Sequence, residues 1–168
     1  MDIEMRIERI ALDPLTHMPI VVLKEAAGER VLPIWIGLLE ASAIATRLEN
    51  VEVTRPLTHD LLRTVIGLLG ARVERITVVD LRDSTFFASI ALRIGSGLEE
   101  VDSRPSDALA LALRTGSPIF VRDEVFEKSR QADATTAPAE PALDVSDQQK
   151  VVEFLENLPP DQFGKYKM

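Results

Sequence analysis

The sequence of 168 residues contains no cysteine and only two histidines, His17 and His59. Without cysteine, disulfide bonds, thiolate chemistry and zinc sites of the Cys/His type are excluded. No apolar run approaches the roughly 20 residues that a membrane-spanning helix needs. The N-terminus is charged and alternating, unlike a secretory signal. These absences predict a cytoplasmic protein that has no contact with a membrane.

Acidic residues outnumber basic ones, and the formal net charge is −8 at pH 7. This balance argues against a general nucleic-acid binder, because phosphate neutralisation usually leaves a basic footprint in the sequence. The hydrophobic fraction of 46% and the charged fraction of 27% are typical of a globular protein. The length fits one domain with a tail.

Alternating apolar residues predict strands, and apolar residues at helical spacing between Gly and Pro predict helices. The strands are expected at residues 3–12, 19–24, 30–36, 72–81, 85–94, 98–102 and 118–122, and the helices at 38–50, 58–69, 105–114 and 123–129. Strands and helices interleave without regular βα alternation. This order predicts an α+β fold, a two-layer domain with a mixed β-sheet covered by helices.

Three parts of different character follow one another along the chain. Residues 1–130 are expected to form the domain. Residues 131–146 are rich in Ala, Asp, Thr and Pro, which predicts a flexible linker. Residues 147–168 begin with an amphipathic pattern that predicts a short helix, expected to dock onto the domain, a partner subunit or another protein. Its apolar positions are Val151, Phe154, Leu155 and Leu158.

Two stretches of the sequence are nearly alike. Both Arg55-Pro56-Leu57-Thr58-His59-Asp60 and Ser103-Arg104-Pro105-Ser106-Asp107 couple an Arg-Pro pair, a hydroxyl and an aspartate to the first turn of an expected helix. Proline suits a helix start because it lacks the N–H that would be unpaired there, and Ser, Thr and Asp accept hydrogen bonds from the remaining N–H groups. The arginines and the histidine are not explained in this way.

Four ordered motifs across about residues 5–130 resemble the bifunctional nuclease domain family. The resemblance implies a compact α+β domain that tends to dimerise and acts on DNA and RNA with little sequence preference. The last residues resemble the tail of actinobacterial-type members. The motifs are Arg30-Val31-Leu32-Pro33-Ile34-Trp35-Ile36-Gly37 with Glu40-Ala41, Arg55–Leu61, Asp83-Ser84-Thr85-Phe86-Phe87-Ala88 and Ser103–Ala108.

Candidate catalytic residues follow from what phosphodiester hydrolysis needs, namely a proton acceptor and stabilisation of phosphoryl charge. His59 is the candidate acid or base, with Asp60 beside it; the alternative is that His59 only caps or packs against the Arg55 loop. Arg55, Arg104 and Ser106 are the candidate phosphate contacts, because they lie at helix starts that favour anions. Alternatively, each arginine pairs with an aspartate of the opposite motif. His17 is expected at the surface.

Aspartates supply the candidate ligands for Mg²⁺ or Mn²⁺, which prefer oxygen donors. The candidates are Asp60, Asp80, Asp102 and Asp107, with Glu40 as a further possibility; the competing interpretation of Asp107 is a helix-start carboxylate. Trp35 is expected to be an anchor in the core or a subunit interface, with base stacking as the alternative. Alanines in the helices at 38–50 and 105–114 permit close packing, which suits a dimer interface.

Two hypotheses of function therefore remain open. The first is a nuclease of broad specificity that hydrolyses DNA and RNA. The second is a non-catalytic dimeric module that binds a small anionic ligand or a protein partner. In a third interpretation, the Arg-Pro motifs have only a structural role, in which Arg55 and Arg104 are buried against aspartates and hold the fold together.

Overall fold

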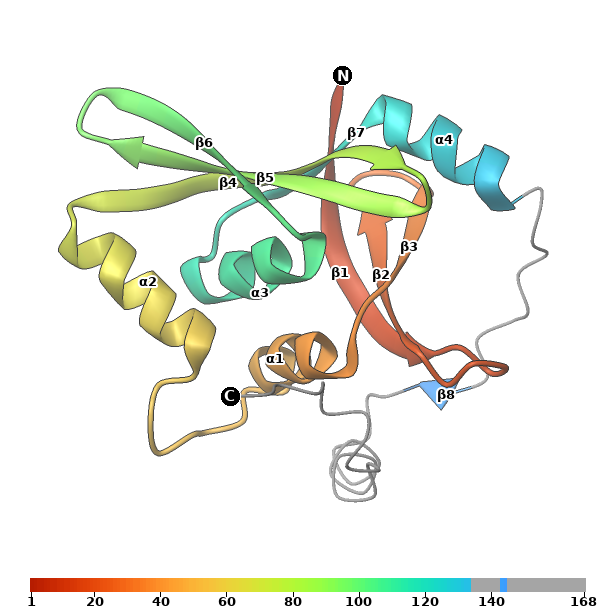
Figure 1. The fold of residues 1–168 in the computed structure, drawn as a ribbon, viewed down its shortest axis with the longest axis horizontal. Coiled ribbons are helices and arrows are strands. Elements are labelled where there is room, and N and C mark those ends of the chain that lie inside the picture. Colours follow the sequence, from red (N-terminus) through yellow and green to blue (C-terminus); the bar gives the residue numbers. More distant parts are fainter. Residues whose placement is uncertain (134–142, 145–168) are drawn as a thin grey trace.

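The structure, a computed structural model, describes residues 1–133 and 143–144. Seven strands form one mixed sheet in the order β3-β2-β1-β7-β4-β5-β6, and the two-residue strand β8 pairs with β1 (Figure 1). Only β4 and β7 pair in parallel among these strands. The elements are β1 (Asp2–Leu12), β2 (Pro19–Glu25), β3 (Val31–Trp35), α1 (Leu38–Leu48), α2 (Thr58–Leu68), β4 (Ala71–Arg82), β5 (Thr85–Ile94), β6 (Gly97–Ser103), α3 (Pro105–Thr115), β7 (Ile119–Arg122), α4 (Asp123–Asp133) and β8 (Leu143–Asp144).

The α+β prediction with a mixed sheet covered by helices is confirmed, and the strands and helices expected within residues 1–130 are all present. One boundary differs noticeably, since α4 continues to Asp133 rather than ending at residue 129. Of the predicted linker beyond α4, Leu143 and Asp144 form β8 on the end of β1. The remainder of that linker and the predicted helix and tail at 147–168 lie outside the described residues.

The core lies between the sheet and helix α3. Every second residue of a strand faces the same side, and Ile76 and Val78 of β4 are buried on the side that α3 covers. Helix α3 is buried almost all round, and its alanines bring it close to the sheet and to α1. These alanines therefore pack within the chain, and the expectation that they form a dimer interface is wrong. Gly116 ends α3 in the left-handed conformation, with φ of 70°.

Helix α4 lies on the other face of the sheet, against β4 and β7 (Figure 1). The pairing of β4 with β5 contains a β-bulge between Val78 and Asp80. This extra residue turns Asp80 to the face opposite Val78, where Lys128 of α4 forms an ion pair with it. The bulge therefore decides which layer of the molecule contains Asp80.

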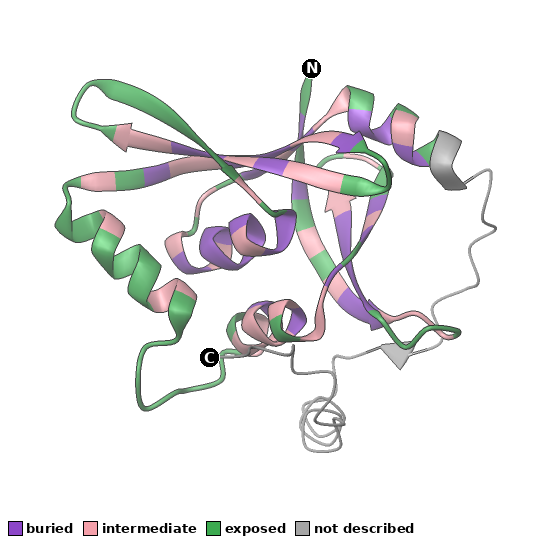
Figure 2. Cartoon of the chain, in the orientation of Figure 1, coloured by how far each residue is buried: buried purple, intermediate pink, exposed green. Residues whose placement is uncertain are grey.

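Helix α2 differs from the other helices because it has an apolar face but no buried residue. Figure 2 shows α2 exposed along nearly its whole length, whereas α3 beside it is buried. The helix contacts only α3 and β4 extensively. Several of its large apolar side chains are open to solvent, among them Leu61, Val65, Leu68 and the following Leu69. This exposed surface, called here the α2 face, is the largest unexplained feature of the fold.

Among the helices of the described residues, none has both the length and the apolar character needed to cross a membrane.

Candidate functional site

Three of the four motifs singled out in the sequence meet at one hollow, called here the Arg104 hollow. Its volume is about 260 Å³. The end of β3 and the start of α1 form one wall, the β4–β5 turn a second, and the N-terminus of α3 a third. The lining residues are Ile34, Trp35, Ile36, Gly37, Glu40, Ser84, Thr85, Phe86, Arg104, Pro105 and Ser106. Segments about 70 residues apart in the chain thus contribute to a single surface feature.

Arg104 joins this hollow to the fourth motif through a chain of ion pairs, called here the Arg104 network. Its Nη1 donates to Oε1 of Glu40 at 2.7 Å, and its Nε donates to Oδ2 of Asp107 at 2.7 Å. The other carboxylate oxygen, Oδ1 of Asp107, lies 3.1 Å from Nε2 of His59 on α2. The arginine–aspartate pair between opposite motifs that the sequence left open is therefore absent for Arg104, which pairs with the aspartate of its own motif. The two motifs are joined instead by the contact between His59 and Asp107, which the sequence analysis did not predict.

Exposure separates the members of this network. The Arg104 side chain is 65% exposed, whereas that of His59 is only 12% exposed. Within the described residues, Nη2 of Arg104 has no hydrogen-bond partner. Arg104 is therefore open to a ligand, and His59 lies behind Asp107 and does not line the hollow.

The charge of Asp107 is maintained by its partners. Partial burial acts to raise the pKa of Asp107, but the hydrogen bonds and charges of Arg104 and His59 outweigh it and hold the pKa below its ordinary value. The carboxylate is therefore ionised at neutral pH. Such a carboxylate favours the tautomer in which Nε2 of His59 carries the proton and Nδ1 is left as an acceptor.

A second pair connects the same two helices and was missed by the sequence analysis. Arg114 near the end of α3 has a side chain only 2% exposed, and its Nε donates to Oδ1 of Asp60 at 2.7 Å. Its Nη1 donates to the carbonyls of Ala43 and Ala110. The available signal was the seven-residue spacing of Asp107 and Arg114, which places both on one face of α3.

Asp60 also holds the start of α2, because its Oδ2 accepts a hydrogen bond from the Leu57 N–H at 3.0 Å. Burial acts to raise the pKa of Asp60, but the Leu57 amide and the Arg114 guanidinium outweigh it and lower the pKa. Two adjacent residues of α2, His59 and Asp60, thus reach two residues of α3. These polar contacts, together with the partly buried Ile66, attach α2 to the rest of the domain.

The other candidates lie apart from the network. Arg55 is exposed in the segment before α2, and no hydrogen bond or ion pair joins it to a described residue. Asp80 and Asp102 lie on the face of the sheet away from α2 and α3, since Asp80 pairs with Lys128 and Asp102 faces the same side. Ser106 is buried in the first turn of α3 and lines the hollow.

The four candidate metal ligands are therefore divided between the two faces of the sheet. Within the described part of the chain, no three His, Asp or Glu side chains form a group that could hold a metal ion. Each of Asp60, Asp80 and Asp107 is paired with a cationic side chain. This arrangement does not fit a shared Mg²⁺ or Mn²⁺ site, and we derive no step through a metal ion.

Trp35 is not a core anchor, contrary to expectation. It is the last residue of the edge strand β3, where buried residues alternate with exposed ones, and it falls on the exposed side. Its indole Nε1 donates to Oδ2 of Asp13 at 3.2 Å, and its ring forms part of the Arg104 hollow. This position leaves base stacking or a subunit contact open to it.

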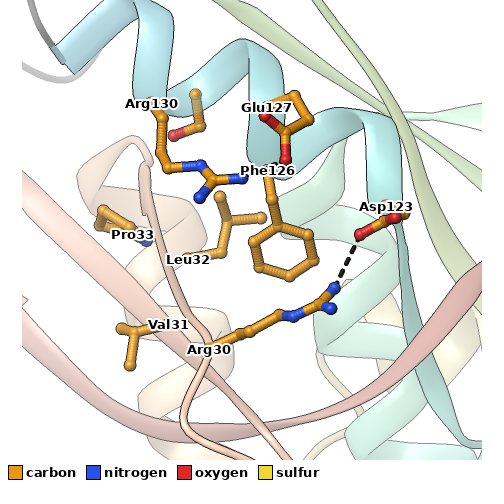
Figure 3. A pocket seen from close by; sticks show the side chains of 9 residues that line it. Arg30, Val31, Leu32, Pro33, Asp123, Phe126, Glu127 and Arg130 are labelled. Carbon is orange, nitrogen blue, oxygen red and sulfur yellow. Dashed lines mark hydrogen bonds and ion pairs between the residues drawn. The ribbon is translucent and has the colours of Figure 1, made fainter.

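A larger hollow, of about 400 Å³, lies between β3 and α4 (Figure 3). Arg30 pairs there with Asp123 at 2.7 Å and lies over the ring of Phe126, and Arg130 pairs with Glu127. Each arginine is thus matched by a carboxylate, and none of the candidate catalytic residues lines this hollow. Size alone does not make it the functional site.

Comparison with known proteins connects this arrangement to one family. The model of the bifunctional nuclease domain matches residues 21–134, which include every member of the Arg104 network. An uncharacterized protein of Mycobacterium tuberculosis (strain H37Rv) is 40% identical over 167 residues, covering 95% of this chain and 97% of its own length.

More distant relatives are named as nucleases. Bifunctional nuclease 1 of Arabidopsis thaliana is 29% identical over 112 residues, which cover 65% of this chain and 34% of the plant protein. Bifunctional nuclease 2 of Oryza sativa subsp. japonica is 28% identical over 107 residues, which cover 61% and 33% respectively. The match therefore concerns about a third of each plant protein.

Proposed function

Because the chain belongs to the bifunctional nuclease domain family, we propose that it is a nuclease of broad specificity that hydrolyses phosphodiester bonds in DNA and RNA. The observation that carries the proposal is the Arg104 hollow, where separate motifs bring an exposed guanidinium, two aromatic rings and a helix N-terminus together. Trp35 and Phe86 offer surfaces on which a base can stack.

Arg104 is the proposed contact to the scissile phosphate. Its guanidinium keeps unused N–H groups while Glu40 and Asp107 hold it in place, and a guanidinium matches phosphate geometry well. The first N–H groups of α3, including that of Ser106, have no partner within the helix and favour an anion at the same place. Arg55, exposed before α2, remains a candidate for a second phosphate contact.

His59 is the proposed acid or base. Asp107 accepts a hydrogen bond from the Nε2–H group of His59, which leaves Nδ1 able to take a proton from water as the phosphodiester is attacked. A structural role is the alternative, since the same contact attaches α2 to α3.

Replacing His59 by alanine tests this role, with His17→Ala as the matched control because His17 lies in an exposed turn. We expect His59→Ala to lower the turnover of single-stranded DNA and RNA by about 10²- to 10⁴-fold, the usual contribution of an acid or base. The measurement uses highly purified full chain, with and without EDTA, across pH 5 to 9 at about one-unit steps.

A role as acid or base predicts that the turnover of the wild type changes with pH near neutrality. His59→Ala should lose both the turnover and this dependence on pH. Slower cleavage with an unchanged pH profile would assign His59 a positioning role instead. Equal cleavage by His59→Ala and the parent would mean that the activity arises elsewhere. The EDTA arm reports separately whether a divalent ion is needed.

The second candidate function, a non-catalytic dimeric module, is favoured by one observation. Arg104 already pairs with two carboxylates, so its charge is compensated within the network, which favours a protein partner over turnover of an anionic phosphodiester. Calorimetry with nucleotides separates the two functions, since a binding module gives saturable heat without any product.

A second copy of this chain is the proposed partner of the α2 face. The outward residues Leu61, Val65 and Leu68 are uncharged, so two copies can meet there without repulsion between like charges. Gly67 beside them has open space around it, which permits close approach of another helix.

Leu68→Lys, at a side chain 81% exposed, is expected to convert a dimer into a monomer because it places a charge in that interface. Light scattering after size exclusion measures the mass. Leu15→Lys is the control, being equally exposed in a turn far from α2 in the sequence. A wild-type protein that stays monomeric at high concentration, or a Leu68→Lys dimer, would contradict this interface.

A further inference from the structure

A third hollow lies between the ends of three helices, beside α2 but apart from the Arg104 hollow. Its volume is about 270 Å³. Arg47 from the last turn of α1, Arg63 from α2 and Arg114 from the end of α3 all line it, and Thr46 and Thr64 add hydroxyl groups. We call it the Arg63 hollow. None of the motifs that suggested the nuclease family explains why three arginines gather here.

Charge distinguishes this hollow from the rest of the molecule. Asp60 is the one acidic residue in its lining, in a chain whose net charge is −8. That carboxylate forms an ion pair with the buried Arg114, with 2.7 Å between Nε of Arg114 and Oδ1 of Asp60, and accepts a hydrogen bond from the Leu57 N–H. Arg47 and Arg63 form no ion pair within the described residues, although the charge of Arg63 helps Arg114 to lower the pKa of Asp60. The hollow therefore holds three arginines against one carboxylate.

Part of the role of these two arginines is structural. Nε of Arg47 donates to the Leu113 carbonyl at 3.4 Å, and Nη1 of Arg63 donates to the Arg114 carbonyl at 3.2 Å. Both contacts satisfy carbonyls in the last turn of α3, which lack partners within the helix. They use one N–H of each guanidinium, which has five. Capping thus explains why the arginines are there but leaves most of their donors and both charges unused.

We propose that the Arg63 hollow binds a phosphate group. Two guanidinium groups that form no ion pair supply the charge and the donors that a phosphate requires. The hydroxyls of Thr46 and Thr64 donate to the carbonyls of Ser42 and Asp60 instead, so the donors to the phosphate come from the guanidinium groups. The buried pair of Arg114 and Asp60 forms a fixed wall of the hollow, because Arg114 is held by three acceptors.

The position of the hollow suggests which phosphate it takes, and this step rests on the proposed nuclease function. Arg104 lines the first site and Arg114 lines the second, and the two residues are ten positions apart on α3, about 15 Å along the helix. Stacked nucleotides advance about 3.4 Å each along a strand. A strand with its scissile phosphate at Arg104 would therefore place a phosphate about four nucleotides away at the Arg63 hollow.

Titration of the purified full chain with inorganic phosphate, followed by calorimetry, tests the site without any cleavage. The double variant Arg47→Gln/Arg63→Gln is expected to bind phosphate at least about 10-fold more weakly, as loss of charge-assisted hydrogen bonds implies. Arg47→Lys/Arg63→Lys should restore part of the affinity. Arg104→Ala, which removes the other proposed phosphate contact, should keep the affinity of the Arg63 hollow. Arg72→Gln, at an exposed arginine paired with Glu74, is the matched control. Melting curves check that every variant is folded.

A second arm uses a single-stranded oligonucleotide with uncleavable linkages. The double Gln variant should weaken its binding and reduce the slope of log affinity against log salt concentration by about two, one for each lost phosphate contact. An unchanged slope with weakened phosphate binding would restrict the site to free phosphate and overturn its role as a strand subsite.

Two results would overturn the phosphate site itself: no saturable phosphate binding by the wild type, or equal binding by the wild type and the double Gln variant. Phosphate binding that depends on Arg47 and Arg63 in a protein that cleaves nothing would uphold this site and reject the nuclease proposal. Cleavage by a protein that shows no such phosphate binding would uphold the nuclease proposal and reject the phosphate site.

Discussion

Arg104→Ala is expected to lower the rate of phosphodiester hydrolysis by about 10²- to 10³-fold, the usual loss when one donor to a developing oxyanion is removed. The reason is that Arg104 is the one cationic side chain among the described residues that line the hollow, and Glu40 and Asp107 hold it while its Nη2 has no hydrogen-bond partner among them. Arg104→Lys should remain well below wild type, because an ammonium cannot keep both carboxylates and a phosphate in planar geometry. The measurement is kcat on single-stranded DNA and RNA.

The matched control is Arg9→Ala, at an exposed arginine of β1 that pairs only with its neighbour Glu8. Glu40→Gln provides a complementary test, since removing one of the two carboxylates should free the guanidinium and tighten binding of a phosphate-containing substrate. Wild-type kcat in folded Arg104→Ala would place the reaction outside the Arg104 hollow. If Arg104→Ala does not fold, the kcat of Arg104→Lys decides the prediction instead, because this variant keeps the positive charge.

Arg114→Met is expected to reduce the free energy of unfolding by about 3–5 kcal/mol, the typical cost of removing one partner of a buried ion pair. The substitution leaves Asp60 without its cation and removes the additional side-chain hydrogen bonds to the Ala43 and Ala110 carbonyls. It also weakens the attachment of α2, which buries no side chain of its own. Urea unfolding followed by circular dichroism measures the change.

The double variant Asp60→Asn/Arg114→Met should lose less than the two single variants added together, because neither charge is then left alone. The pKa of Asp60 is lowered in the folded state, so the pair contributes fully above the ordinary pKa of an aspartate. This contribution disappears as the pH falls through the lowered value, and Asp60→Asn should remove that part of the acid dependence. A loss below about 1 kcal/mol for Arg114→Met would show that the pair is not important to stability.

Prediction of the elements from the sequence succeeded because their signals are local. The start of α3 follows from Pro105 at its first position, and its end follows from Gly116, whose positive φ suits glycine. The alternation in β1 likewise places Ile3 and Met5 in the core. Such patterns depend on neighbours within a few residues, and no tertiary contact overrides them here.

The candidate site was predicted only in part, because its members meet across the fold. The Arg104–Asp107 contact is local, whereas the contacts to Glu40 and His59 depend on how α1, α2 and α3 pack. Arg114 was overlooked because a basic residue in the last turn of a helix usually faces solvent and favours the helix dipole. Only the docking of α2 and α1 around it shows that its guanidinium is buried.

The division of the aspartates illustrates the same limit most sharply. Simple alternation from Val78 would place Asp80 on the side of α3, but the bulge between them moves it to the side of α4. The sequence by itself determined the strands, the helices and the two motifs at helix starts, since these depend on short-range sterics and periodicity. The tertiary structure alone decided which charges meet, because pairing across α2 and α3 and the face of each strand residue depend on long-range packing and register.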